Sequence, residues 1–251
     1  MSYPSNMTDS QWQVIEKIQH DYRKRHYSLR EVWNGLFYIL KTGCQWRMLP
    51  TDLPPWPLVY YYFKRWKENG LIEEVHQALY EQSRKQQGKK PQASVAIIDS
   101  QSAATTSCAG QQRGFDMGKK VKGRKRHLAV DSLGLVQSVL VHSASDQDRT
   151  AGHWMVKELM KANPAVKTIY ADGGYNGKLE AYTASLGCKM IIVKRSDKAF
   201  KVLPKRWLVE RTFAWITAQR RNAKDYEKQT ESSRTMIFIA LIRIMLTRIQ
   251  T

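Results

Sequence analysis

The hexapeptide VAIIDS at residues 95–100 begins with a short apolar run rich in β-branched residues, Val95 to Ile98, which is followed by an acidic residue, Asp99. Such a run is typical of a buried strand. TIYADGGY at residues 168–175 repeats the pattern and ends its apolar run at Asp172. If the two strands are parallel neighbours about 5 Å apart, both aspartates lie at one site. A third acid, Glu210 in RWLVERTFAW at residues 206–215, falls in a helical pattern.

Three acids at one site need a compensating positive charge. Carboxylate oxygens suit Mg²⁺ or Mn²⁺, and two such ions about 4 Å apart can promote in-line phosphoryl transfer. Each acid also has a simpler interpretation. Asp99 can cap the turn that follows it, Asp172 can be a turn residue before two glycines, and Glu210 can pair with Arg206. The joint pattern favours the metal site, because three separate coincidences are less probable than one.

The net charge of +19 over 251 residues indicates a polyanionic partner. Beside a carboxylate site, nucleic acid is a better candidate than a membrane or an acidic protein. No GxxxxGK[ST] motif is present, so no nucleotide cofactor is expected. Three cysteines far apart predict neither a disulfide framework nor a zinc ribbon. The apolar stretch at 237–249 is broken by Arg243 and Arg248, which predicts a core or interface helix and no membrane span.

A polar, basic stretch at Ser83 to Gln92 predicts a linker between a helical domain at 1–90 and a second domain at 91–251. In the first domain, two capping boxes predict the first two helices, Thr8 with Gln11 and Ser28 with Glu31. A third helix is expected from about Leu58. Its polar face carries Tyr61, Lys64 and Arg65 and suits a DNA-recognition helix of the helix-turn-helix type. A solvated face of a helical bundle is an equally good interpretation.

The second domain alternates strands and helices, which predicts a mixed α/β sheet with helices on its faces. We expect strands at about 95–100, 125–131, 136–144, 167–172 and 188–194, and helices at about 147–162, 177–186, 203–222 and 232–250. The sequence from Asp131 to Gly134 predicts the turn of a hairpin. Asp146 and Asp148 are expected to cap the helix that follows them.

Six cations within eight residues begin that hairpin, and a phosphate-binding role is favoured over a solvated run: Lys119, Lys120, Lys122, Arg124, Lys125 and Arg126. His127 and His142 have no partner histidine at metal spacing. We interpret them as structural residues or as DNA contacts.

The chain resembles the DDE transposases of bacterial insertion sequences, in the insertion-sequence-five group of the insertion-sequence-four-like superfamily. MTDSQWQVIE, LREVWNGLFYILKTGCQWRMLP and PPWPLVYYYFKRW are similar to that family's N-terminal domain. IIDSQSA, GKKVKGRKRHLAVDSLGL, YADGGYNG and RWLVERTFAWITAQRRNAKDYE resemble its catalytic blocks in order and spacing. The resemblance implies a ribonuclease-H-like domain with Asp99, Asp172 and Glu210 as its catalytic, metal-binding residues.

Two positions depart from the superfamily's tyrosine-arginine-glutamate-lysine signature. Leu203 stands where tyrosine is expected, and Thr217 stands where lysine or arginine is expected. Arg206 keeps its spacing to Glu210 and is expected to contact DNA. Arg220 or Arg221 is the expected substitute for the basic residue at Thr217.

The resemblance implies an enzyme that binds the terminal inverted repeats of its element and uses two Mg²⁺ ions, or Mn²⁺, for DNA cleavage and strand transfer. Its partners would be terminal-repeat DNA, target DNA and at least one further copy of the chain. The apolar helix near 236–249 is a candidate for that interface. A cytoplasmic, nucleoid-associated location is expected. The alternatives are a nuclease that cuts without joining, a catalytically silent DNA-binding regulator and, less favoured, an RNA-binding protein.

Overall fold

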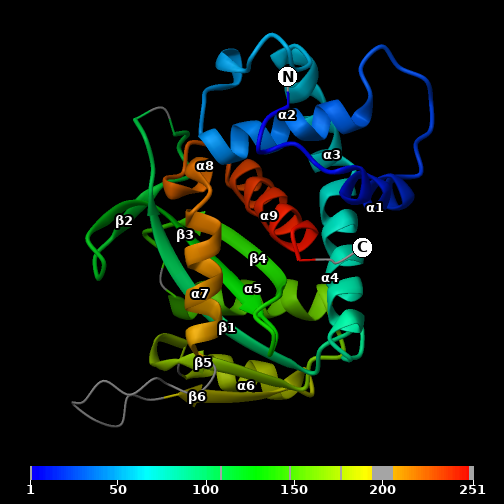
Figure 1. Ribbon diagram of the computed structural model, residues 1–251. Helices are drawn as coiled ribbons and strands as arrows, with labels where there is room; N and C mark the ends of the chain where they lie inside the picture. Colours follow the sequence, from blue (N-terminus) through cyan, green and yellow to red (C-terminus); the bar gives the residue numbers. More distant parts are fainter. Residues whose placement is uncertain (1, 108, 147, 176, 194–205, 249–251) are drawn as a thin grey trace. The chain divides into compact units, whose positions relative to one another are not determined.

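The computed structural model describes residues 2–107, 109–146, 148–175, 177–193 and 206–248 (Figure 1). The chain forms two compact units. The helical unit comprises Met1–Lys89, Ile216–Lys224 and Thr235–Thr251, and the sheet unit comprises Lys90–Trp215 and Asp225–Arg234. The assignment of DNA recognition to residues 1–90 and of catalysis to residues 91–251 stays a prediction.

The first 90 residues are helical, as the capping signals indicate. The α-helices are α1 (Asp9–Gln19), α2 (Leu29–Thr42), α3 (Trp56–Glu68) and α4 (Leu71–Gln86), with a short 3₁₀ helix, η1 (Trp46–Met48). Thr8 and Ser28 form the two predicted capping boxes. Helix α3 starts two residues earlier than expected, because Pro57 is tolerated in a first helical turn. The predicted linker is wrong at its start, since Ser83 to Gln86 belong to α4.

Two buried tryptophans pack against each other in the core of the helical unit. Trp33 of α2 and Trp66 of α3 stack with ring centroids 4.9 Å apart, and both are buried. The unit also contains α8 (Arg220–Ala223) and most of α9 (Thr230–Leu246). Every residue of α9 from Met236 to Ile242 is buried, which agrees with the interpretation of this stretch as a core helix; its contribution to a dimer interface stays a prediction. Within the described part of the chain, no helix is long and apolar enough to cross a membrane.

The sheet unit contains a six-stranded mixed sheet in the order β2-β3-β1-β5-β6, with β4 also paired to β3. The strands are β1 (Val95–Ala104), β2 (Gly114–Asp116), β3 (Val121–Val130), β4 (Val136–Ser143), β5 (Thr168–Asp172) and β6 (Lys189–Val193). Strand β2 was not predicted, and β1 and β3 are longer than expected. The hairpin of β3 and β4 is confirmed, with Gly134 donating to the Asp131 carbonyl at 3.0 Å.

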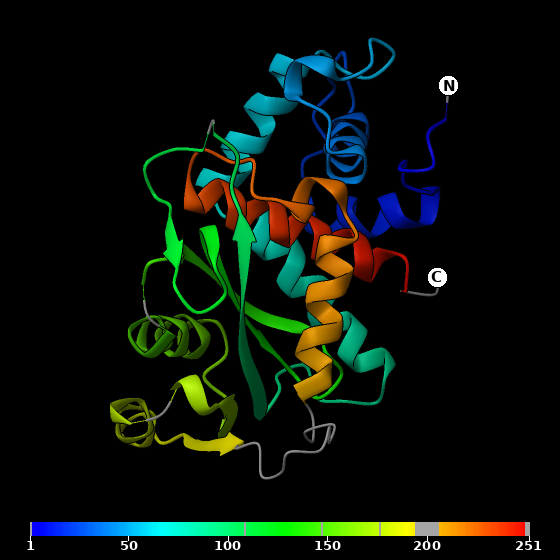
Figure 2. The same cartoon turned by 90° about the vertical axis from the view of Figure 1, so that its left-hand side faces the viewer.

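The expected parallel pairing of the acid-bearing strands is confirmed. Strands β1 and β5 pair in parallel with Ile97 opposite Tyr170, which brings Asp99 within β1 close to Asp172 at the end of β5. Helices α5 (Asp148–Ala162) and α6 (Lys178–Ser185) lie on one side of the sheet, and α7 (Arg206–Thr217) lies on the other (Figure 2). This mixed α/β arrangement agrees with the expected ribonuclease-H-like fold.

Candidate active site

The middle of β1 and the end of β5 place two aspartates side by side. Continuing the register of Ile97 with Tyr170 by two residues sets Asp99 level with Asp172. Asp99 is buried, with 8% of its surface exposed, and Asp172 is half-buried. Asp172 makes the local contact of a turn residue, whereas Asp99 lies within β1, which continues to Ala104, so the interpretation that it caps a following turn is wrong. The Ser100 amide donates to Asp99 Oδ1 at 2.7 Å, and the Gly174 amide donates to Asp172 Oδ1 at 3.0 Å.

Helix α7 brings the third acid to the same place. Its position is fixed at the β3–β4 turn, where Thr212 Oγ1 donates to the Gly134 carbonyl and Arg211 donates to the Leu133 carbonyl, both at 2.9 Å. The exposed Glu210 and the buried Phe213, one helical turn apart, point into a pocket of about 400 Å³. The complete lining of that pocket is Asp99, Ser100, Gln101, Ser102, Lys119, Asp172, Glu210 and Phe213.

The pocket therefore combines three carboxylates with one lysine. Lys119 is exposed and donates from Nζ to the Ser100 carbonyl at 2.9 Å. Carboxylate oxygens are the ligands that Mg²⁺ and Mn²⁺ prefer, so the chemistry of the lining suits such ions. Among the residues that the structure describes, however, no three His, Cys, Asp or Glu side chains meet closely enough to hold one ion. Like charges repel in the absence of a cation, which opposes closer approach.

The turn that carries Lys119 is ordered by a buried carboxylate. Asp116 Oδ1 accepts hydrogen bonds from the amides of Gly118 and Lys119, both at 3.0 Å, and Oδ2 accepts one from Ser102 Oγ at 2.6 Å. Burial opposes ionisation of Asp116, but these hydrogen bonds and the nearby Lys125 outweigh it and lower its pKa to about 2. The ionised carboxylate therefore holds the β2–β3 turn beside the pocket at neutral pH.

The predicted run of six DNA-contacting cations divides into two groups. Lys119, Lys120 and Lys122 are exposed at the turn and the start of β3. The other three cations, Arg124, Lys125 and Arg126, are buried, so their assignment as DNA contacts is wrong. In this fold their side chains interact with other groups of the protein. The sequence pattern gave no sign of this difference, because the buried side chains are bonded to residues distant in the sequence.

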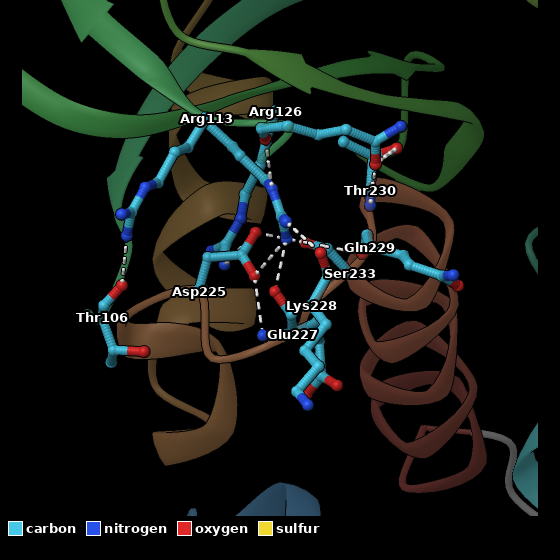
Figure 3. Close-up of polar contacts among 11 residues, drawn as sticks. Thr106, Arg113, Arg126, Asp225, Glu227, Lys228, Gln229, Thr230 and Ser233 are labelled. Atoms are coloured by element: carbon cyan, nitrogen blue, oxygen red, sulfur yellow. Dashed lines mark hydrogen bonds and ion pairs between the residues drawn. The ribbon is translucent and has the colours of Figure 1, made fainter. Parts of the chain in front are cut away.

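Asp225, Glu227, Ser233 and the carbonyl of Lys228 form part of a buried polar cluster (Figure 3). Arg124 makes the most contacts with these residues. Its guanidinium donates to Asp225 Oδ1 at 3.0 Å and to the carbonyls of Glu227 and Lys228 at 2.8 and 3.0 Å. Ser233 Oγ donates to the other oxygen of Asp225 at 2.6 Å. Arg126 approaches that oxygen at 3.9 Å, and burial lowers its pKa. Sequence reasoning missed this cluster.

The other predicted DNA contacts are distributed over both units. Tyr61, Lys64 and Arg65 lie on the exposed face of α3, as expected. Arg220 is exposed, whereas Arg221 is buried, donates to the Cys44 carbonyl at 3.1 Å and lies over the Trp46 ring. Arg221 is thus used within the helical unit, which makes it a poor substitute for the basic residue expected at Thr217.

Three of the residues to which the sequence analysis gave roles cannot be compared with the structure. Leu203 lies outside the described residues, and the side chains of Arg206 and Asp148 are likewise not described. Asp146 lies 3.3 Å from His142 Nδ1, an ion pair only when that histidine is protonated. His127 and His142 are buried and stack at 4.8 Å, so the structural interpretation of both is the one that fits.

Comparison with known families identifies the chain. Residues 90–245 match the family model described as "Transposase DDE domain". The chain belongs to the DDE-domain transposases. Residues 7–76 match a second model, for transposases of the IS4/5 family. No curated protein matches the chain.

The two family matches confirm the resemblance that the motifs indicated. They make the chain a transposase whose substrates are DNA, in a family that generally uses divalent metal ions. The DDE-domain match covers the sheet and all three pocket acids of this transposase, and the other match covers α1 to α3 and the start of α4.

Proposed function

We propose that Asp99, Asp172 and Glu210 are the catalytic residues of this transposase, and that the pocket they share is where DNA strands are cut and joined. One observation carries the proposal: residues from β1, β5 and α7, separated by up to 111 positions from Asp99 to Glu210, line a single pocket. Of the three, Asp99 is the most buried and is held by the strand itself. Glu210 is exposed on α7 and lines the pocket together with the two aspartates.

The three carboxylates would hold two Mg²⁺ ions, for which Mn²⁺ can substitute. When bound, such ions activate the attacking hydroxyl and stabilise the charge on the leaving oxygen. Cleavage would hydrolyse a phosphodiester at the end of the element and free a 3′-hydroxyl. In joining, that hydroxyl attacks a target phosphodiester: one phosphorus–oxygen bond forms while another breaks, and no covalent bond between protein and DNA is required.

For DNA binding we propose two exposed surfaces. The α3 surface, formed by Tyr61, Lys64 and Arg65, would read the terminal inverted repeats. The hairpin surface, formed by Lys119, Lys120 and Lys122, would hold backbone phosphates beside the pocket. Exposed Arg220 is a further phosphate-binding candidate. Bringing two element ends together would require at least a dimer.

The catalytic assignment is tested with Asp172→Ala. The variant should bind a terminal-repeat duplex with the wild-type affinity in a gel-shift assay and should lose Mg²⁺-dependent cleavage. Glu180→Gln is the matched control, because Glu180 is an exposed acid on α6 outside the pocket. Cleavage retained by Asp172→Ala would refute the assignment.

Two further assays separate the remaining alternatives. A strand-transfer assay with pre-cut ends should yield joined products, whereas a nuclease that cannot join would leave the ends unjoined. A DNA-binding regulator would bind the repeats but remain silent in Mg²⁺, in Mn²⁺ and in Ca²⁺.

A further inference from the structure

Tyr175 ends the turn that carries Asp172. A short 3₁₀ helix, η2 (Gly173–Tyr175), follows Asp172 directly and turns the tyrosine into the protein, where 1% of its surface is exposed. Its hydroxyl lies 2.7 Å from Nδ1 of His127, which is fully buried. The two side chains therefore share a hydrogen bond that is shielded from water, where such a bond is most effective and its loss most costly.

His127 belongs to the strand that pairs with the other aspartate's strand. In the antiparallel register of β1 and β3, His127 is opposite Ser100 and Leu128 is opposite Asp99. The hydrogen bond from Tyr175 thus ties the Asp172 turn to the strand beside Asp99. Two constraints consequently set the separation of Asp99 and Asp172. One is the β1–β5 pairing that precedes both residues in their strands, and the other is the Tyr175–His127 hydrogen bond that follows Asp172 in the chain.

The Tyr175 ring has little room to move. It belongs to the buried cluster that includes Met155, Val156 and Leu179. On α5, a Cβ added at Gly152 would lie 3.0 Å from the Tyr175 ring and 2.6 Å from Leu179. A glycine in mid-helix costs about 1 kcal/mol relative to alanine, so its presence here is explained by close approach of the ring.

We propose that Tyr175 and His127 are positioning residues that fix the distance between the Asp99 and Asp172 carboxylates for binding divalent cations. This inference rests on the proposed function. The two carboxylates repel each other without a cation, and a turn that contains two successive glycines is too flexible to resist that repulsion alone. Side chains that hold metal ligands in place without touching the metal are important for affinity: their removal commonly weakens metal binding by about 10–100-fold.

The protonation state of the histidine is consistent with this role. Burial, together with the nearby His142, Lys125 and Lys119, lowers the pKa of His127 well below its usual value. The ring is therefore neutral at pH 7, with one nitrogen donating and the other accepting. A neutral ring forms the bond to the Tyr175 hydroxyl without adding a positive charge beside the metal ligands.

The test measures Mn²⁺ binding to the full chain without DNA, by electron paramagnetic resonance of the free ion, well below the unfolding temperature. Tyr175→Phe should raise the Mn²⁺ dissociation constant about 10-fold or more. Tyr182→Phe is the matched control, a partly buried tyrosine of α6 that packs against His153, and should leave the constant unchanged. Gly152→Ala, which pushes on the ring and keeps the hydroxyl, should also weaken binding.

A double-mutant cycle with His127→Phe separates positioning from general destabilisation. If the two residues act through their shared hydrogen bond, the variant with both substitutions should bind Mn²⁺ no more weakly than whichever of Tyr175→Phe and His127→Phe binds it less well. Folded Tyr175→Phe and Gly152→Ala proteins that both bind with the wild-type constant would overturn the inference. If Asp99→Asn also leaves Mn²⁺ binding unchanged, the proposed catalytic site itself is wrong. If Asp99→Asn alone abolishes binding, only the positioning role fails.

Discussion

Arg124 and Asp225, 101 positions apart in the chain, form a fully buried ion pair of 3.0 Å within the sheet unit. Asp225 follows α8, and its amide donates to the Ala104 carbonyl at the end of β1 at 2.8 Å. The ion pair therefore attaches Asp225 to β3, and the amide bond attaches it to β1, the strand that carries Asp99. Removing one partner would leave an uncompensated charge in the interior.

Substitution of Arg124 should destabilise the sheet unit strongly. We expect Arg124→Ala to lower the free energy of unfolding by about 3–5 kcal/mol, measured by urea denaturation. Arg124→Lys should recover little of the loss, because one ammonium group cannot donate to Asp225 and to several carbonyls in the planar geometry of a guanidinium. Wild-type stability in Arg124→Lys would show that charge alone is sufficient.

The three exposed lysines of the hairpin surface should contribute to DNA affinity through phosphate contacts. The logarithm of the binding constant falls linearly with the logarithm of the salt concentration, and each phosphate contact makes that slope steeper by about 0.9. Lys120→Ala and Lys122→Ala should each reduce that slope by about 0.9 on any DNA sequence. Lys157→Ala is the control, an exposed lysine on α5 on the other side of the sheet from α7. Slopes equal to the wild-type value in both hairpin variants would exclude this surface.

Stability should decline in mild acid because His127 is buried and neutral. Its pKa in the folded protein is lowered by burial first and by His142 next. Below about pH 6.5 the unfolded chain binds a proton that the folded chain does not, so the free energy of unfolding falls by up to about 1.4 kcal/mol per pH unit. The decline continues until the lowered pKa is reached.

The contribution of His127 is isolated by comparing wild type with His127→Asn in urea titrations from pH 7.5 to pH 5. Other titrating groups are present in both proteins and cancel. The variant should be less stable at pH 7.5 but lose less stability toward pH 5. Parallel pH profiles would contradict the assignment of the acid sensitivity to this ring.

The acid triad could be located from sequence because its supporting elements carry local signals. The apolar runs that open the buried parallel strands β1 and β5 each lead directly to an aspartate, Asp99 within β1 and Asp172 at the end of β5. The segment from Ser83 to Gln86 was wrongly predicted as linker because its local sequence does not indicate a helix. It is polar, but Arg84 is buried and covers the ring of Tyr80 at 5.7 Å, which extends α4 past the apparent linker.

The burial of half the basic run could not be predicted either. A cluster of arginines resembles a solvated surface until its partners are known, and Asp225 and Glu227, which bind Arg124, lie more than 100 residues further along the chain. Strand β2 has three residues and no apolar alternation, so only its pairing with β3 reveals it. For α9, sequence cannot distinguish a helix buried within its own fold from one buried against a second copy.

Lys119 leads to a prediction in which metal binding and DNA binding change in opposite directions. Its ammonium group lies at the Ser100 carbonyl and lines the same pocket as the three acids. A positive charge there repels a divalent cation, by about 1 kcal/mol at a water-like dielectric constant. Lys119→Met should therefore tighten Mn²⁺ binding about five-fold while weakening binding to DNA. Lys120→Met, at an exposed position outside the pocket lining, should weaken DNA binding and leave Mn²⁺ affinity unchanged. Weaker Mn²⁺ binding in Lys119→Met would mean that this lysine supports the carboxylate geometry more than it repels the ion.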